Sequence, residues 1–452
     1  MARGQLVQDM TNGNETKLLI KFMMPMLFGN IFQQFYNIAD SIIVGRFVSD
    51  NALGAIGCTA SVTFLFFAMC SGLASGAGIM VAQYFGASKE DDVKKTLTNS
   101  FYMVVIFGVF FSILGVFLTR PVLELLNTPK AQLEEAVIYM QIACAGTIAV
   151  AIYNYAAQVM RALGDAKTPL IFLVVATALN IILDFVFILA FDMGVAGAAY
   201  ATIIAQGVSA VGSLGYAFLK NPYFKLKREH YRFYYDKARM CISIGLPLTM
   251  QGFTIASSCV ILQRFVNGFD AAVVTAFTVT SRVEQFVQQP FSSLSTAMST
   301  FTGQNMGAGK KERVRKAFGS AVKITVVISI IMLCVCYFAG EYIVGCFVED
   351  PQVIAIGTKG LKIISLMFFP LGMIYVTRGL LNGANDTFYA MINGIIEVCC
   401  RVGFAVAFVT VIPLGMWSVW FATGGTWVVT GLAGTIRYKQ GIWLQKSIVC
   451  PA

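Results

Sequence analysis

Long apolar stretches recur along the whole chain and constrain its fold more than any other feature. They return about every 35–40 residues, and each is close to the roughly 20 residues that a helix needs to cross a bilayer. Only 12% of the 452 residues are charged, whereas a soluble protein carries about 25%. The sequence therefore predicts an all-α membrane protein embedded in the lipid bilayer, with no room for a sizeable soluble domain.

We expect twelve transmembrane helices. Their predicted ranges are 17–45, 53–82, 96–119, 133–160, 168–190, 194–219, 239–266, 271–302, 316–340, 353–378, 387–411 and 415–437. Cytoplasmic loops of membrane proteins are enriched in Lys and Arg, so the distribution of positive charge predicts the orientation. With the N-terminus inside, the cytoplasmic segments hold about 24 positive residues, Arg378 among them. The outer loops hold only Arg46, Arg120 and Lys130.

Both termini are thus predicted to be cytoplasmic, in a multi-pass protein of the cell inner (plasma) membrane. This topology also explains the net charge of +10, which would otherwise suggest a nucleic-acid partner. No nucleic acid is expected to bind. His230, the only histidine, lies in a basic stretch and is expected to be a solvated loop residue.

The two halves of the chain repeat one another. The stretch QYFGASK at 83–89 returns as QNMGAGK at 304–310, and Pro25 in the first helix matches Pro247 in the seventh. These landmarks share an offset of about 219–222 residues. Six helices per repeat is an even number, so both halves enter the membrane in the same sense as a parallel repeat. The predicted parts are an N-lobe of helices one to six over 1–219, a basic cytoplasmic linker over 220–238 and a C-lobe over 239–452.

Asp40 marks the first candidate site, because a carboxylate at membrane depth is costly and usually functional. Tyr36, Asn37 and Gln33 precede it by four, three and seven residues, which places all four side chains on one face of a helix. We predict that this face looks inward, towards protein or a water-filled cavity. Asp40 is predicted to bind and release a coupling cation.

A second acid lies in the same half of the chain. Asn180 and Asp184 are one helical turn apart in the fifth predicted helix. Two buried carboxylates that approach each other cannot both stay ionised without cost, so Asp40 and Asp184 are expected to titrate as a coupled pair. Such a pair can bind a proton, or Na⁺ if Tyr36, Asn180 and Thr202 supply further oxygens. The alternative is that these groups only satisfy one another.

The second half has no acid at the counterpart of Asp40, but it has its own polar set. Glu284 and Gln288 share a helix face and are predicted to line a substrate cavity. Glu397 and Arg401 lie one turn apart, and are either part of that cavity or an ion pair that neutralises itself.

Several motifs together resemble the multidrug and toxic compound extrusion (MATE) family, in its prokaryotic branches related to the DNA-damage-inducible F and Mep-type exporters. The resemblance covers essentially the whole chain. The motifs are Pro25 with DSIIVG at 40–45, QYFGA at 83–87, RALGD at 161–165, NIILD at 180–184 followed by GVAGAA at 194–199, and QNMGA at 304–308.

The resemblance implies two six-helix lobes around a central cavity. It also implies export of cationic, amphipathic drugs and toxic compounds in exchange for H⁺ or Na⁺, by alternating access. In similar proteins the cation site matches Asp40, Asn180, Asp184 and Thr202 here, which would also be the metal ligands if the ion is Na⁺. Tyrosines like Tyr36 and Tyr139 lie nearby in those proteins. Some relatives place essential acids in the C-lobe, where Glu284 is a candidate counterpart.

Other functions remain as alternatives. A flippase for a lipid-linked saccharide, of related architecture, would need a cavity rich in cations, for which Arg264, Arg282 and Arg401 are the candidates. A channel or receptor is disfavoured by the two-lobed repeat. No phosphate-binding GxxxxGK[ST] loop is present, so ATP is not the expected energy source. Nothing in the sequence resembles a nucleophile with a base in range, so we do not expect an enzyme. We expect a monomeric transporter without a cofactor.

Overall fold

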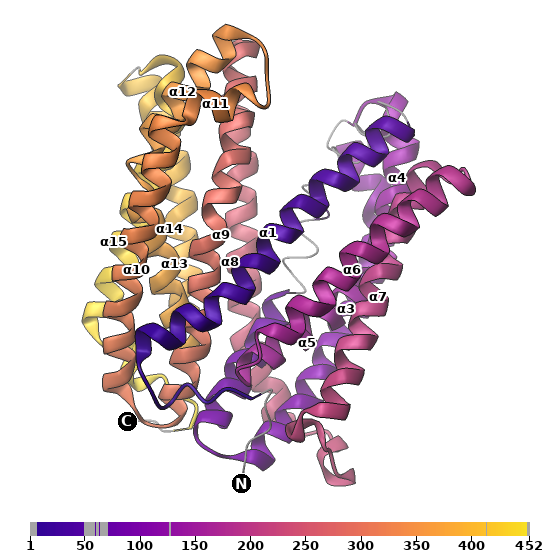
Figure 1. The fold of residues 1–452 in the computed structure, drawn as a ribbon, viewed down its shortest axis with the longest axis vertical. Coiled ribbons are helices and arrows are strands. Elements are labelled where there is room, and N and C mark those ends of the chain that lie inside the picture. The colour runs from indigo at the N-terminus through magenta and orange to yellow at the C-terminus, as the bar shows by residue number, and fades with distance from the viewer. Residues whose placement is uncertain are drawn as a thin grey trace. The chain divides into compact units, whose positions relative to one another are not determined.

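The computed structural model describes residues 7–48, 59, 63, 71–125, 128–412 and 414–449, except for the side chains of residues 38–42, 44–46 and 131. These described residues are helical almost throughout and include no β-strand (Figure 1). The prediction of an all-α protein is therefore confirmed.

The helices follow one another with short connections. The α-helices are α1 (Glu15–Phe47), α3 (Glu90–Leu125), α4 (Lys130–Ala145), α5 (Thr147–Ala162), α6 (Lys167–Asp184), α7 (Gly194–Lys220), α8 (Tyr235–Val266), α9 (Ala271–Gly307), α10 (Lys311–Phe338), α11 (Gly340–Gly345), α12 (Pro351–Ser365), α13 (Phe368–Gly383), α14 (Thr387–Val406) and α15 (Ser418–Gln440). Two π-helices, η1 (Phe185–Ala190) and η4 (Ala407–Val411), continue α6 and α14. Short 3₁₀ turns are η2 (Pro222–Phe224), η3 (Arg228–Tyr231), η5 (Gly415–Trp417) and η6 (Ile442–Gln445). Residues 71–86 are also helical.

Six of the described helices are long and apolar enough to cross a membrane singly, namely α3, α6 with η1, α7, α8, α10 and α14 with η4. Two further spans are bent pairs, α4 with α5 at 44° and α12 with α13 at 52°. The other four predicted segments are helical wherever the structure describes them, in α1, residues 71–86, α9 and α15. The predicted segments 133–160 and 353–378 are wrong in one respect, because each is broken rather than continuous.

The repeat predicted from short motifs is present in the helices themselves. The starts of α3, α4 and α5 return as the starts of α10, α12 and α13 at an offset of 221 residues. The offset stays within 220–222 residues for α6 and α14 and for the π-helices η1 and η4. Both halves therefore contain one broken span and one span that ends in a π-helix.

The two breaks are built from the same pair of positions with the small and large residues exchanged. A Cβ atom on Gly146, between α4 and α5, would lie 2.2 Å from the side chain of Ile203 in α7. In the other half, a Cβ atom on Gly424 in α15 would lie 2.8 Å from the side chain of Met367, between α12 and α13. In each case a glycine accepts a large neighbour at the bend, so the break is fixed by packing between helices.

Contacts divide the chain into two compact units. Unit 1 contains residues 1–9 and 25–252, and unit 2 contains residues 10–24 and 253–452. The divisions fall inside α1, at Pro25, and inside α8, five residues after Pro247. This division follows packing rather than the repeat, so the lobe boundaries drawn from the sequence stay a prediction.

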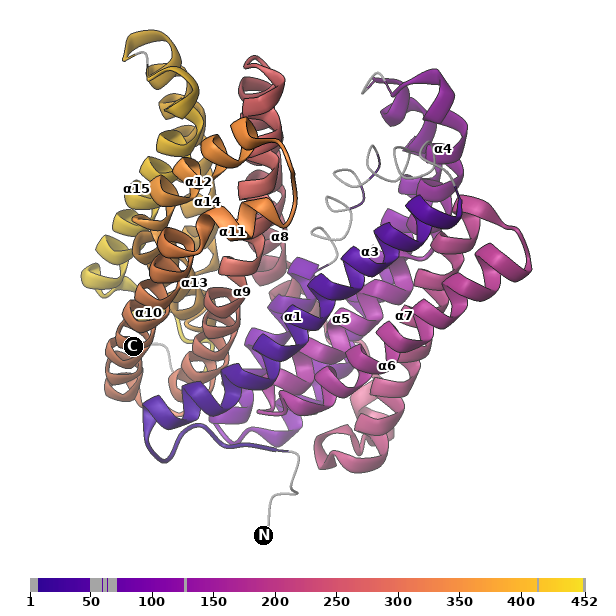
Figure 2. The same cartoon turned by 45° about the horizontal axis from the view of Figure 1, so that its top comes forward.

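Each unit is a helical bundle. In unit 1, α3, α5, α6 and α7 lie side by side, and in unit 2 α9, α10, α13 and α15 do so (Figures 1 and 2). The core of unit 2 is centred on large buried side chains such as Trp420, whose Nε1 donates to Thr280 Oγ1 at 3.1 Å. A Cβ atom on Gly360 would lie 2.5 Å from the Trp420 ring, so this glycine makes room for the indole.

The repeated motif at 304–310 holds the N-terminal segment of the chain in unit 2. The backbone N–H of Met10 donates to Gln304 Oε1 at 2.8 Å, and Asn305 Nδ2 donates to the Met10 carbonyl at 3.1 Å. Lys310 Nζ donates to the Thr11 carbonyl at 2.8 Å. Met10, Gln304 and Asn305 are all fully buried. The motif thus supplies amide and ammonium partners for a segment that has no helical hydrogen bonds of its own.

Replacing Arg313 with alanine is expected to lower the stability of unit 2. The Arg313 guanidinium donates to Asn305 Oδ1 at 3.1 Å and to the Gly13 carbonyl at 2.9 Å, and pairs with Glu15 at 3.1 Å. Loss of these charge-assisted bonds should remove about 1–2 kcal/mol, and lower the Tm in detergent by a few degrees. The control is Lys316→Ala, an exposed residue one turn later on α10. Equal Tm values for the two variants would contradict the assignment.

Candidate functional site

Unit 1 brings together four of the residues predicted to bind the coupling cation, namely Tyr36, Asn180, Thr202 and Asp184. Tyr36 Oη lies 3.3 Å from Thr202 Oγ1, and Asn180 Nδ2 lies 3.3 Å from the same oxygen. The Thr202 hydroxyl itself donates to the Ala198 carbonyl at 3.1 Å. Helices α1, α6 and α7 therefore meet at the Thr202 hydroxyl.

Asn180 also connects this group to Asp184. With its amide in the opposite orientation, the Asn180 nitrogen donates to Asp184 Oδ2 at 3.0 Å and its oxygen accepts from the Thr202 N–H at 3.1 Å. That orientation satisfies both ends of the amide, because the oxygen then faces a donor and the nitrogen an acceptor. The result is a chain of polar groups from Asp184 through Asn180 to Thr202.

Asp184 is fully buried and is the last residue of α6 before the π-helix η1. Asn180 is 2% exposed. A π-helical turn adds a residue to the helix and is frequent at functional sites, because it changes the direction of the side chains around it. The buried acid therefore lies at the point where the backbone of this span departs from the regular α-helix.

An apolar cluster borders these polar groups. Ile43 of α1, Ile188 of η1, and Val195 and Ala198 of α7 are buried together, and Tyr139 of α4 packs against them. Tyr139 thus lies in the same region of unit 1, and its role in binding the coupling cation stays a prediction.

The side chain of Asp40 lies outside the described residues, so its contact with Asp184 stays a prediction. Its backbone belongs to α1, between Tyr36, one turn before, and Ile43, three residues after. Both of these neighbours contact the α6–α7 region described above. Gln33 and Asn37, on the same predicted face, are exposed.

Unit 2 contains a second polar group, centred on Glu397. Arg378 Nη2 donates to Glu397 Oε2 at 2.5 Å, and Arg401 Nη2 donates to Glu397 Oε1 at 2.8 Å. Glu397 and Arg401 are 5% and 6% exposed. Arg401 Nη1 also donates to Ser258 Oγ of α8 at 2.7 Å. One buried carboxylate is thus held between two guanidinium groups.

Three more polar side chains lie beside this group. Gln288 Nε2 donates to Glu284 Oε1 at 2.7 Å, and the Tyr375 hydroxyl donates to Gln288 Oε1 at 2.9 Å. Glu284 is close enough to Arg401 to interact with it electrostatically. Two acids therefore accompany two arginines, Arg378 and Arg401, so the formal charges balance.

The family follows from comparison with known proteins. The MatE family model matches residues 25–186 and 247–422, which is well over half of the chain. The chain belongs to the MatE family. The two matched segments lie one in each half, in agreement with the repeat, and MatE proteins are transporters rather than enzymes, as predicted.

Several relatives of this MatE chain span nearly its full length. "Probable multidrug resistance protein YpnP" of Bacillus subtilis is 28% identical over 445 residues, covering 96% of this chain and 97% of that protein. "Probable multidrug resistance protein NorM" of Thermotoga maritima is 24% identical over 439 residues, covering 96% and 94%.

Solved structures share the fold. A MOP superfamily transporter from Pyrococcus furiosus superimposes with a TM-score of 0.90 at 23% identity, covering 96% of this chain and 97% of that one. An outward-facing multidrug resistance MATE family transporter gives a TM-score of 0.91 at 22% identity, with the same coverage. The predicted membrane fold of two repeated halves is thus confirmed.

Arg378 belongs to the polar group of unit 2, although the sequence analysis did not include it among the site residues. The predicted span ends at Arg378, but α13 continues to Gly383 and Arg378 pairs with buried Glu397. Its Nε also donates to Asn393 Oδ1 at 3.0 Å. The sequence left open whether Glu397 and Arg401 line the cavity or form an ion pair. They do form an ion pair, and Glu397 also pairs with Arg378, so one carboxylate faces two guanidinium groups.

The expectation for His230 is wrong. The ring is 2% exposed, with Nε2 3.0 Å from Asp91 Oδ1 and Nδ1 accepting from the Lys227 N–H at 2.8 Å. Asp91, Glu229 and His230 are the group in the described residues that could in principle hold a metal ion. However, Nδ1 accepts a hydrogen bond, so the proton of the neutral ring is on Nε2 and the ring has no lone pair there for a metal.

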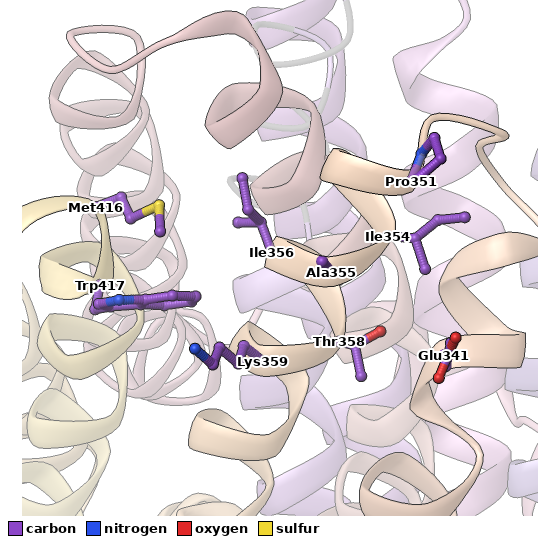
Figure 3. A pocket seen from close by; sticks show the side chains of 9 residues that line it. All are labelled: Glu341, Pro351, Ile354, Ala355, Ile356, Thr358, Lys359, Met416 and Trp417. Carbon is purple, nitrogen blue, oxygen red and sulfur yellow. The ribbon is translucent and has the colours of Figure 1, made fainter.

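A cavity of about 510 Å³ opens in unit 2 between α11, α12 and η5 (Figure 3). Glu341, Lys359 and Trp417 are among the residues that line this cavity. Lys359 Nζ lies 5.5 Å from the centroid of the Trp417 ring. None of the residues predicted to form the substrate cavity lines this pocket.

Proposed function

We propose that this MatE protein exports cationic, amphipathic drugs in exchange for H⁺ or Na⁺, by alternating access. The observation that carries the proposal is the fully buried Asp184, linked through Asn180 to Thr202 and Tyr36 in unit 1. A buried carboxylate at the end of a chain of amide, hydroxyl and phenol groups can take up a proton, or Na⁺ if oxygens of those groups complete the coordination shell. The relatives described as multidrug resistance proteins support the drug class.

In the proposed cycle, ionised Asp40 and Asp184 favour a cationic drug when the protein is open to the cytoplasm. Uptake of the coupling cation from outside weakens drug binding and repacks α1 near Pro25, where the contact-based division into units also falls. Alternating access requires such a point of bending, and proline inside a helix supplies one because it removes a backbone hydrogen bond.

The energetics favour two exchangeable acids. One pH unit corresponds to about 1.4 kcal/mol per proton, and 100 mV to about 2.3 kcal/mol per charge. Exchange of one proton for one monovalent drug moves no net charge, so a unit of pH gradient supports only about a tenfold drug gradient. Two protons support about a hundredfold gradient and add the membrane potential.

We further propose a monomer in the plasma membrane, with both termini and the basic linker in the cytoplasm. The asymmetry of Lys and Arg in the sequence supports this orientation.

The decisive experiment is transport by the purified protein in sealed vesicles. A pH gradient and a Na⁺ gradient are imposed separately, and movement of an ethidium-like dye is followed by fluorescence. Uphill dye movement driven by one of these gradients is expected. Movement that only equalises the dye, with either gradient, would overturn the proposal and leave a channel.

A flippase for a lipid-linked saccharide is less well supported. It needs cationic side chains available to a phosphate, whereas Arg401 is held by Glu397 at 2.8 Å. Arg264 and Arg282 are exposed, but neither belongs to the buried polar group of unit 2. A defect in envelope synthesis after deletion, without a defect in dye efflux, would favour the flippase.

Substituting Glu284 with glutamine is expected to weaken binding of cationic dyes. Glutamine can still accept from Gln288, so the local fold is kept, but the charge that balances Arg378 and Arg401 is lost. The excess positive charge should reduce dye affinity on the order of tenfold, measured by fluorescence titration in detergent. The control is Glu341→Gln, an acid of unit 2 that lines the separate cavity of Figure 3. Unchanged affinity in Glu284→Gln would remove this residue from the substrate cavity.

A further inference from the structure

The linker between α7 and α8 is fixed along the side of α3. Its backbone makes four hydrogen bonds with side chains of α3. They join Thr98 Oγ1 to the His230 carbonyl, Asn99 Nδ2 to the Arg232 carbonyl (3.2 Å), the Tyr234 N–H to Asn99 Oδ1 (2.7 Å) and Tyr102 Oη to the Tyr231 carbonyl (3.0 Å). Because these bonds use the linker's backbone, the directions of its side chains are defined while the side chains themselves stay available.

A hydrogen bond and an ion pair strengthen this attachment at the start of α3. Buried His230 bonds to Asp91, as described above, and Lys237 Nζ pairs with Asp92 at 2.7 Å. Lys237 also lies 3.9 Å from the centroid of the Tyr84 ring. The linker is therefore an ordered part of unit 1 and not a loose connection.

The outward side of the linker and of the first residues of α8 combines aromatic and basic side chains. Tyr231, Phe233 and Tyr235 are 52%, 57% and 68% exposed. The exposed basic residues of this stretch are Lys225, Lys227, Arg228, Arg232 and Arg239. The exposed acids are Glu229 and Asp236. We name this set of exposed side chains, within residues 225–239, the linker surface; it carries an excess of positive charge.

The level of the linker along α3 places these aromatic rings at the edge of the apolar band. Tyr102, which bonds to the Tyr231 carbonyl, lies about 18 Å along α3 from Glu90 at 1.5 Å per residue. At this level the polar run TLTNS at 96–100 gives way to the apolar run MVVIFGVFF at 103–111. Aromatic side chains concentrate at this depth in membrane proteins, because their rings suit the headgroup region.

We propose that the linker surface binds the headgroups of anionic phospholipids in the leaflet beside it. The rings of Tyr231 and Phe233 lie at headgroup depth, and the basic side chains pair with the lipid phosphates. Clusters of Lys and Arg next to a membrane span attract anionic lipid in this way. The chemistry recognised is a phosphate monoanion next to an apolar layer, which a soluble acidic protein does not supply.

Hydrogen exchange of the full-length protein in lipid nanodiscs tests the proposal. One set of discs contains phosphatidylcholine alone and the other contains one third phosphatidylglycerol. We expect the amides of 225–239 to exchange several-fold more slowly in the anionic discs. Equal exchange in both sets would overturn the proposal. Adding soluble glycerol phosphate to the zwitterionic discs separates a lipid from a free phosphate, and equal protection there would overturn the requirement for lipid.

Two variants show which side chains are responsible. Lys227→Gln/Arg228→Gln/Arg232→Gln keeps the backbone bonds to α3 and should remove most of the several-fold slowing of exchange in the anionic discs. Its control, Lys316→Gln/Lys439→Gln/Lys446→Gln, makes the same change of charge at exposed positions of unit 2 and should keep this slowing. Phe233→Ser should reduce protection in both kinds of disc. An equal effect of the two triple variants would show that only net charge matters, and would overturn a site on the linker.

Discussion

Substituting Glu397 with leucine is expected to destabilise unit 2 by about 3–5 kcal/mol, because it removes the carboxylate that two largely buried guanidinium groups share. Arg378 and Arg401 both donate to this carboxylate, and its side chain is only 6% exposed. The variant should accumulate poorly in membranes, and the fraction that is purified should unfold well below the Tm of the parent protein. Thermal unfolding in detergent, followed by near-ultraviolet circular dichroism, measures the difference.

A compensated variant separates lost charge balance from lost packing. Glu284→Gln/Arg378→Met/Glu397→Leu/Arg401→Met removes all four charges together and keeps much of the apolar volume. Replacement of a whole buried ion-pair group by hydrophobic residues is often neutral or stabilising, so this variant should recover most of the stability lost in Glu397→Leu. A Glu397→Leu protein as stable as its parent would show that the two arginines find other partners, and would contradict the structure of this group.

The helices and the repeat were predictable because their signals are local. Each span has an apolar run of sufficient length, and the repeated motifs at 83–89 and 304–310 align the two halves without any knowledge of their packing. The breaks at Gly146 and Met367 were not predictable in this way. They depend on the pairs Gly146–Ile203 and Met367–Gly424, in which small and large residues are exchanged between halves. Neither member of a pair signals a bend on its own.

The candidate sites were predictable only where one helix carries the whole pattern. Asn180 and Asp184 share a face of α6, and Glu397 and Arg401 share a face of α14, so spacing alone indicates both pairs. Arg378 reaches Glu397 from another helix, and nothing in the sequence distinguishes it from a cytoplasmic arginine beyond a span. His230 was misjudged for the same reason, because its partner Asp91 is 139 residues away in sequence.

Substituting Asp184 with asparagine is expected to reduce coupled transport while leaving the fold intact. An asparagine oxygen at this position can still accept from the Asn180 amide, which lies 3.0 Å from Asp184 Oδ2. The change removes one exchangeable charge, so in a proton-coupled exchange of two protons for one monovalent drug the limiting gradient should fall from about a hundredfold to about tenfold per pH unit. Dye accumulation at steady state, measured in vesicles over a series of imposed pH gradients, gives this slope directly, and a Tm in detergent equal to or above that of the parent shows that the protein is folded.

The matched control is Asp165→Asn, which changes another buried acid of unit 1. Asp165 is 6% exposed and accepts from the backbone N–H groups of Lys167 and Thr168, both at 3.0 Å, at the start of α6. Asparagine can keep these bonds, so this variant should retain the parent slope although it loses the same charge from the same helix region. Asp40→Asn should behave as Asp184→Asn does if the two acids form one exchange site, and the double variant should lose the dependence on pH altogether. A parent-like slope in Asp184→Asn would mean that the ionisation of this buried carboxylate does not drive export.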